Sequence, residues 1–287
     1  MNPNRKQLLP TSRTFFKLVL FIVTFTLVIF VFSIVSGLFF HWMLEAEDSS
    51  VIDLLYRAAS LVGAGLTVYF FTRCWDQVNF TSIGFQTKGR VCDFLAGSIL
   101  AASMIFVGFA VLWMFDSIAI KAIELNYTYL FVSFLSFSAV AIMEEMVCRG
   151  YILNNLMQVT NKYAALIFSS LVFAFLHLLN PHASFIPILN IFLAGIFLGI
   201  SYLYTRNLWF PIGLHLFWNF MQGPILGFNV SGTNSENSLL QLDYPREDIF
   251  NGGAFGFEGS ILCTLFCSVG AIAVGYYYSR KEKNSQQ

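Results

Sequence analysis

Most of this sequence consists of long apolar runs, and its charges gather in the short segments between them. Charged residues make up 11% of the 287 residues and hydrophobic residues 57%, whereas an ordinary soluble domain has about 25% charged residues. Such a chain buries its apolar surface in lipid as well as in a core. The pattern excludes a water-soluble enzyme and a disordered protein. With a formal net charge of zero, it also excludes a nucleic-acid binder, which needs a basic face.

Eight apolar runs are candidates for membrane spans, because about 20 apolar residues in a helix cross the hydrocarbon core of a bilayer. We therefore predict an all-α, polytopic membrane protein with about eight transmembrane helices and its functional site in the core of the helix bundle. The first run is too long for a signal peptide, so it should remain as a helix. The predicted spans are Phe15–Phe40, Leu54–Phe71, Val91–Phe115, Tyr127–Asn155, Ala164–Leu179, Phe185–Tyr204, Trp209–Phe228 and Gly259–Tyr278.

The charges of the loops predict the direction of the spans. With a cytoplasmic N-terminus, twelve basic residues fall on the inside and two on the outside, as the positive-inside rule requires. We therefore expect a multi-pass protein of the cell membrane with both termini in the cytoplasm. The inside residues are Arg5, Lys6, Arg13, Lys17, Arg73, Lys88, Arg90, Lys162, Arg206, Arg280, Lys281 and Lys283, and the outside residues are Lys121 and Arg246.

The spans divide the chain into three regions. We expect a two-helix region over residues 1–90, a core over 91–227, and an outside loop with a last helix over 228–287. The loop 229–257 is rich in Gly, Asn and Ser, and is either a lid or a flexible connection. Gly195 and Gly199 form a face for close helix packing. The five cysteines have no redox or metal-binding spacing, and we expect Cys263 and Cys267 to fill apolar space.

The fourth predicted span contains Glu144, Glu145 and Arg149. Charges at bilayer depth are costly and usually serve function. Glu145 and Arg149 are four residues apart and can pair, whereas Glu144 points about 100° away and is left unpaired along its own helix. A desolvated carboxylate of this kind suits a general base. The alternative is that these charges form the solvated cytoplasmic end of the helix.

Two further spans carry polar groups. His177 lies on the fifth span, and His215 and Asn219 share one face of the seventh. Counted from the loop near Lys162, Glu144 and His177 lie at similar depths, roughly 27 and 23 Å along their helices. His215 reaches that depth only if the preceding loop dips into the bundle or the helices tilt, and Pro211 makes a break there plausible.

A carboxylate, two imidazoles and an amide can activate a water molecule and stabilise an oxyanion, which amide hydrolysis requires. The same Glu144, His177 and His215 could instead hold a divalent metal such as zinc with an open position. The sequence has neither an H-E-x-x-H motif nor a G-x-S-x-G motif beside the histidines. The spacing leaves metal-free and metal-assisted hydrolysis both open, with no cofactor as our expectation.

Three motifs occur in order on successive spans: Glu144-Glu145-x-x-x-Arg149, Phe173-x-x-x-His177 and His215-x-x-x-Asn219. Together they resemble the motifs of the CPBP (Abi) family of intramembrane proteases, which includes the type II CAAX prenyl proteases and bacteriocin-processing proteases. The resemblance covers about residues 90–222, and the glycine-rich approach to the last span is similar to that of bacterial members.

The resemblance implies a glutamic-type intramembrane endopeptidase. Glu144 would activate water together with His177, while His215 and Asn219 would bind the oxyanion. Glu145 and Arg149 would support the site. The implied partners are a peptide or membrane-protein substrate and the lipid bilayer.

Two other functions fit a chain of this kind. Some members of the family are described as bacteriocin-immunity or regulatory proteins, and a non-enzymatic membrane scaffold of that type would not need its motifs intact. A small-solute transporter would show inverted repeats with paired broken helices, which the sequence lacks. Intact motifs therefore favour the protease.

Overall fold

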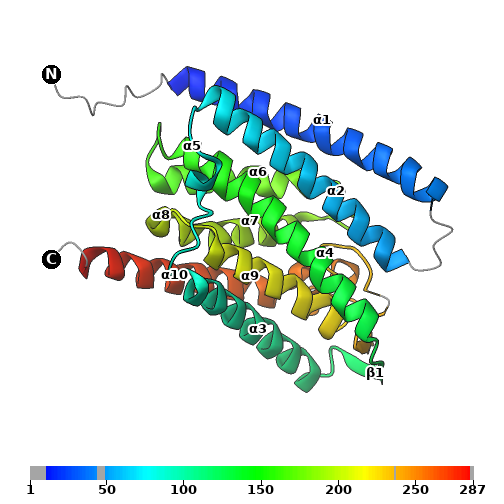
Figure 1. Ribbon diagram of the computed structural model, residues 1–287. Helices are drawn as coiled ribbons and strands as arrows, with labels where there is room; N and C mark the ends of the chain where they lie inside the picture. Colours follow the sequence, from blue (N-terminus) through cyan, green and yellow to red (C-terminus); the bar gives the residue numbers. More distant parts are fainter. Residues whose placement is uncertain (1–10, 44–48, 236, 285–287) are drawn as a thin grey trace, which may run out of the picture.

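Long helices run side by side through most of the chain in the computed structural model, which describes residues 11–43, 49–235 and 237–284 (Figure 1). Helix α1 (Thr11–Met43) pairs with α2 (Ser49–Phe70), and α2 packs against α4 (Tyr127–Glu145). Helix α4 runs directly into a π-helical segment, η3 (Met146–Leu153), and then into α5 (Asn154–Leu156). The side chain of Asn126 starts α4 by accepting a hydrogen bond from the backbone N–H of Tyr129.

Among the described residues, six helices are long and apolar enough to cross a membrane. The chain is thus an all-α, multi-pass membrane protein, as predicted, but the count of eight spans is not confirmed. The remaining two predicted spans are helical but short: α6 (Lys162–Leu176), and α9 (Trp209–Phe220) with the π-helical segment η4 (Met221–Ile225). The six cover Thr11–Phe39, Ser50–Trp75, α3 (Val91–Met114), Tyr127–Leu156, Phe185–Thr205, which comprises α7 (Phe185–Ile200) and α8 (Tyr202–Thr205), and α10 (Ile261–Asn284).

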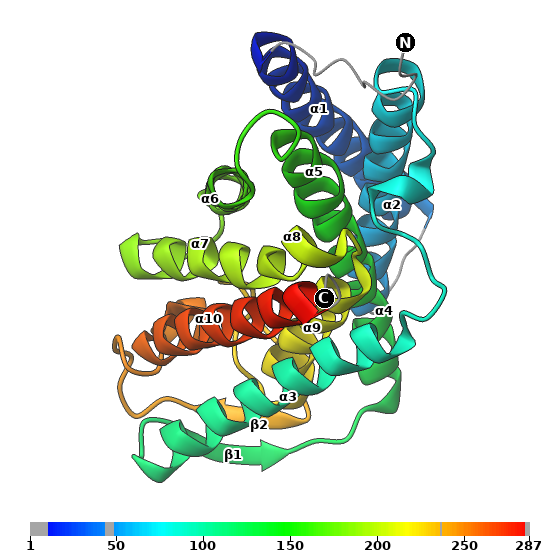
Figure 2. The same cartoon turned by 90° about the vertical axis from the view of Figure 1, so that its left-hand side faces the viewer.

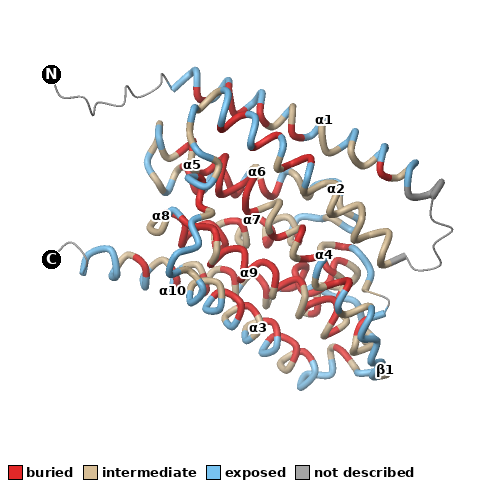
Figure 3. Tube along the Cα trace, viewed as in Figure 1, coloured by how far each residue is buried: buried red, intermediate tan, exposed pale blue. Residues whose placement is uncertain are grey.

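The buried core is centred on α4, η3, α7 and α9, which the other helices surround (Figure 3). Glycines let neighbouring backbones approach closely there. A Cβ atom at Gly97 on α3 would collide with the backbone of α9 at Phe210, and one at Gly213 on α9 would collide with the backbone of α3 at Phe94. Gly195 on α7 lies against Ser170 of α6, so the predicted small-residue face does pack two helices together.

The sequence did not predict a small antiparallel sheet, in which β1 (Ala119–Ile123) pairs with β2 (Leu240–Asp243) (Figure 2). Strand β2 belongs to the loop at 229–257, whose described residues are folded rather than merely connecting. Two short 3₁₀ turns, η5 (Gly253–Phe255) and η6 (Phe257–Gly259), bury Phe255 and Phe257 in the core. The loop is therefore held by β2 near its middle and by Phe255 and Phe257 near its C-terminal end.

Two details differ from the sequence-based expectations. Lys17, assigned to an inside loop, lies within α1 and is buried, where its ammonium group bonds Asp76 and Asn155. Pro211 causes no break, because it lies in the first turn of α9, where the missing N–H needs no helical partner. Asn207 and Leu208, in the loop before α9, are buried against the 80–86 segment. Arg5 and Lys6 lie outside the described residues.

The contact between α3 and α9 predicts a specific sensitivity to a single methyl group. Gly97→Ala should lower the free energy of unfolding by about 1–3 kcal/mol, because backbone atoms cannot move aside for the new Cβ. Gly65→Ala on α2 is the matched control, since a Cβ there meets nothing within 4 Å. Thermal unfolding of the purified variants in detergent measures both changes. Equal stability of the two variants would contradict the packing described.

Candidate active site

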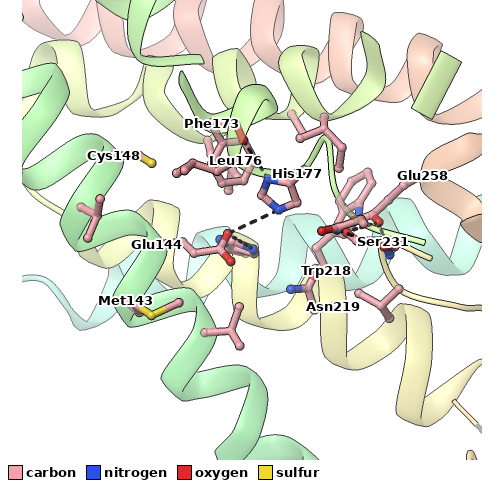
Figure 4. A pocket seen from close by; sticks show the side chains of 18 of the residues that line it. Met143, Glu144, Cys148, Phe173, Leu176, His177, Trp218, Asn219, Ser231 and Glu258 are labelled. Atoms are coloured by element: carbon pink, nitrogen blue, oxygen red, sulfur yellow. Dashed lines mark hydrogen bonds and ion pairs between the residues drawn. The ribbon is translucent and has the colours of Figure 1, made fainter. Parts of the chain in front are cut away.

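A cavity of about 370 Å³ lies among the helices, and four of the predicted site residues line it. Glu144 projects from α4, His177 follows the end of α6, and Asn219 projects from α9 (Figure 4). His215 also lies on α9 and lines the cavity. The other two predicted residues, Glu145 and Arg149, are buried behind the cavity wall. All six residues proposed from sequence thus lie in one region, and all except Arg149 and His177 lie on regular α-helix.

Glu144 faces both histidines. Its Oε2 lies 3.9 Å from Nε2 of His177 and 3.8 Å from Nε2 of His215. These separations are too long for direct hydrogen bonds, yet short enough for one small molecule to contact all three groups. Glu144 Oε2 is buried and has no hydrogen-bond partner among the described residues. A buried acceptor of this kind needs a partner, and a water molecule between the three side chains would supply it.

In each imidazole ring, Nδ1 is hydrogen-bonded away from Glu144, and Nε2 faces the Glu144 carboxylate. Nδ1 of His177 lies 2.8 Å from the carbonyl oxygen of Phe173, and Nδ1 of His215 lies 2.9 Å from Oε1 of Glu145. Because a carbonyl oxygen only accepts, His177 donates its Nδ1–H, and Nε2 of the neutral ring then carries the lone pair. His215 donates in the same way to the Glu145 carboxylate. That carboxylate is also placed to stabilise a second proton on His215.

Glu145 holds two different groups with one oxygen. Its Oε1 accepts from Arg149, at 2.9 Å, as well as from His215. The Arg149 guanidinium also donates to the carbonyl oxygen of Gly195 at 3.0 Å and lies 4.4 Å from the ring centre of Phe173. Both Glu145 and Arg149 are almost fully buried. The predicted pair therefore exists and connects α4, α7 and α9 beneath the cavity.

The side-chain amide of Asn219 faces the same cavity (Figure 4). It lies one helical turn after His215 and has no side-chain hydrogen bond among the described residues. An amide N–H that is free in a largely apolar cavity can bind an oxygen that develops negative charge. Phe173, Leu176 and Trp218 supply apolar walls around it.

The residues named as possible zinc ligands suit zinc in chemical type but not in spacing. Ligands about 2.0–2.1 Å from one zinc ion lie closer together than the 3.8–3.9 Å that separates Glu144 from the two histidines. Among the described residues, no group of three or more His, Cys, Asp or Glu side chains is arranged to hold a metal ion. Metal-free hydrolysis at this cavity therefore stays a prediction.

The sequence missed several polar residues that line the cavity: Arg57, Asn180, Ser231 and Glu258. Oε2 of Glu258 accepts from the backbone N–H of Ser231 at 2.7 Å and from its hydroxyl at 2.8 Å. Burial raises the pKa of the Glu258 carboxyl, while those two hydrogen bonds oppose the shift. The available signal was a lone acid directly before the last apolar run. Nothing in the sequence marks Ser231.

The buried pair of Glu145 and Arg149 predicts that substitutions at the two residues have strongly coupled effects on the free energy of unfolding. Arg149→Met should lower the free energy of unfolding by about 3–5 kcal/mol, because it leaves Glu145 as an unpaired buried charge. Glu145→Gln together with Arg149→Met should recover part of this loss. The more exposed pair Arg90–Asp93 is the control, and its removal should cost at most about 1 kcal/mol. The free energy of unfolding of the two single variants and the double variant, each purified, measures this coupling. If the losses from the Glu145 and Arg149 substitutions simply added, the coupling would be contradicted.

Comparison with known proteins gives a family likeness for part of the chain. No curated protein matches the chain. Residues 126–221 match the family described as "Type II CAAX prenyl endopeptidase Rce1-like". This segment runs from the start of α4 into the start of η4 and contains all six predicted site residues. Over this segment, about a third of the chain, the protein is similar to the Rce1-like family of type II CAAX prenyl endopeptidases, which its three motifs also resemble.

Proposed function

We propose that this protein is an intramembrane endopeptidase in which Glu144 activates a water molecule to hydrolyse a peptide bond. The family supports an intramembrane protease in general. The observation that supports the glutamic mechanism is the position of Glu144 Oε2, which lies within 3.8–3.9 Å of Nε2 of both histidines in a cavity at bilayer depth. A water molecule held there is adjacent to a base and to groups that stabilise negative charge.

The reaction follows from the three polar side chains around the water. Glu144 accepts a proton as the water oxygen forms a bond to the substrate carbonyl carbon, and Nε2 of His177 accepts the second hydrogen of the water in a hydrogen bond. The carbonyl oxygen becomes an oxyanion, which binds the Asn219 amide N–H and the protonated Nε2 of His215. The carbon–nitrogen bond then breaks, and Glu144 returns its proton to the leaving amine.

The buried pair of Glu145 and Arg149 positions this machinery without contacting the substrate. Because Glu145 accepts from Nδ1 of His215, it orients the imidazole and stabilises its positive charge during oxyanion binding. Arg149 keeps the Glu145 carboxylate in place. The apolar walls of the cavity reduce the local dielectric constant and so strengthen these interactions. The substrate class is a peptide or a segment of a membrane protein.

The non-enzymatic scaffold is less well supported. A scaffold has no need to place an unpaired buried carboxylate oxygen opposite two imidazole nitrogens, since such a group destabilises the fold. The site also keeps its second set of polar interactions, from Glu145 to Arg149 and from Arg149 to Gly195. A catalytic role for Glu144 explains why the fold tolerates the destabilising burial of its unpaired oxygen.

The mechanism predicts that Glu144→Gln removes proteolysis but leaves the protein folded and inserted. The amide has nearly the shape of the carboxylate but cannot accept the proton, so we expect a loss of about 10²–10⁴-fold or more. Mass spectrometry of secreted and membrane peptides should show products in cells with the wild-type protein that are absent with Glu144→Gln. Glu124→Gln is the matched control, because Glu124 does not line the cavity, and it should give the wild-type peptide pattern.

Two results would contradict this proposal. One is an unchanged peptide pattern in cells that express Glu144→Gln at the wild-type level. The other is full biological activity of a Glu144→Ala protein, which would favour the scaffold.

A further inference from the structure

The cavity is lined by connections from one end of the bundle. Apart from helix residues, its wall contains Asn180 from the connection after α6, and Val230, Ser231, Thr233 and Glu258 from the loop after η4. Among the described residues, none from the connections at 76–90, 157–161 or 206–208 lines it. Asn180 and Ser231 are partly exposed and Thr233 is exposed. The connections that contribute to the wall thus belong to the end of the bundle that carries β1 (Figure 1), and exposed Thr26 of α1 also lines the cavity.

The opposite end of the bundle is closed beneath the site. Ile83, Tyr202 and Leu208 have at most 1% exposure and lie against η3, the segment that follows Glu145. The Tyr202 hydroxyl donates to the carbonyl oxygen of Ile83 at 2.7 Å. The backbone N–H of Leu208 donates to the carbonyl oxygen of Gly84 at 2.9 Å. These contacts fix the 80–86 segment against η3, and among the described residues none of this segment lines the cavity.

The charges identify which end faces the cytoplasm. Within the described residues, ten basic residues lie at the closed end and two at the open end, and basic residues mark the cytoplasmic side. Acidic residues of the open end include Asp116, Glu124, Asp243, Glu247 and Asp248. The ten at the closed end are Arg13, Lys17, Arg73, Lys88, Arg90, Lys162, Arg206, Arg280, Lys281 and Lys283, and the two at the open end are Lys121 and Arg246.

The rim of the open end suits an extended polypeptide. An extended chain presents an N–H or C=O group to each side about every 3.3 Å, and these groups need partners where water is scarce. Asn180, Ser231 and Thr233 line this part of the cavity. Their side-chain N–H and O–H groups already donate to protein oxygens, so their oxygen atoms are left to accept from a bound chain. Oε1 of Glu258 has no protein hydrogen-bond partner among the described residues, while its Oε2 is held by Ser231.

We propose that the active-site cavity opens to the extracytoplasmic side of the membrane. Its substrate is then a polypeptide segment presented on that side, in an exported peptide or in the outer part of a membrane protein, and not the tail of a cytoplasmic protein. The statement about the substrate rests on the proposed function, whereas the direction of the opening does not. Segments outside the family match, including the connection that carries Ser231 and Glu258, form this opening.

Cysteine labelling in intact cells tests the direction of the opening. The exposed native thiols, Cys74 and Cys92, are first replaced by serine. Val140→Cys is then introduced, because Val140 lines the cavity one helical turn before Glu144. Thr233→Cys probes the mouth in a second variant. The probe is a small, membrane-impermeant methanethiosulfonate, and the background protein without an added cysteine measures any reaction of Cys148 and Cys267 in the cavity wall.

We expect both added cysteines to be labelled in intact cells. A protein that keeps only Cys74 of the two exposed native thiols is the matched control, and it should be labelled only after permeabilisation because Cys74 lies at the closed end. The proposal is overturned if Val140→Cys is labelled only from the cytoplasmic face or from neither face. Labelling is read directly on the protein, so it gives a result even if no variant shows proteolysis. If proteolysis is found, labelling of Thr233→Cys from outside should abolish it.

Discussion

Glu145 is a carboxylate with no exposed surface at bilayer depth, and the positions of three helices depend on how its charge is neutralised. One oxygen binds both Arg149 and His215, and Arg149 reaches on to the backbone of α7. Leaving such a charge unpaired would cost several kcal/mol, so α4, α7 and α9 are held in one arrangement. That arrangement brings His215 to the same point as Glu144. The residue that fixes the fold is thus adjacent in sequence to the residue that we propose as the base.

The cavity is lined by two parts of the chain, one inside the family-matched segment and one outside it. The family-matched segment supplies Glu144, His177, His215 and Asn219, which carry the proposed chemistry. The connection after η4 supplies Ser231, Thr233 and Glu258, and it is fixed by the hydrogen bonds of Asn190 to the backbone at Glu258 and Ser260. Chemistry and access can therefore vary separately. We infer that the outer connection determines which polypeptides reach a site whose reaction is set by α4, α6 and α9.

The sequence predicts the helices well, and it singles out polar residues that the fold brings together, because both depend on local patterns. Hydropathy marks spans whatever their packing, and Glu144, His177 and His215 are conspicuous as polar groups within apolar runs. The pairing of Glu145 with Arg149 follows from helical spacing alone. The sheet of β1 and β2, the buried position of Lys17 and the role of Glu258 depend on contacts between distant segments, which one sequence does not reveal. The count of eight spans is not confirmed, since α6 and α9 are apolar but shorter than the six candidate spans of the described residues.

The central claim is that the side chains of this protein activate water directly, with Glu144 as the base. The most direct measurement is the cleavage rate of the purified, reconstituted protein after metal removal, with its metal content determined by elemental analysis. The account predicts that metal-free wild-type protein retains its full rate on a peptide identified in cells. Loss of activity with the metal, followed by recovery when zinc is restored, would contradict the account and assign Glu144, His177 and His215 to a metal centre instead.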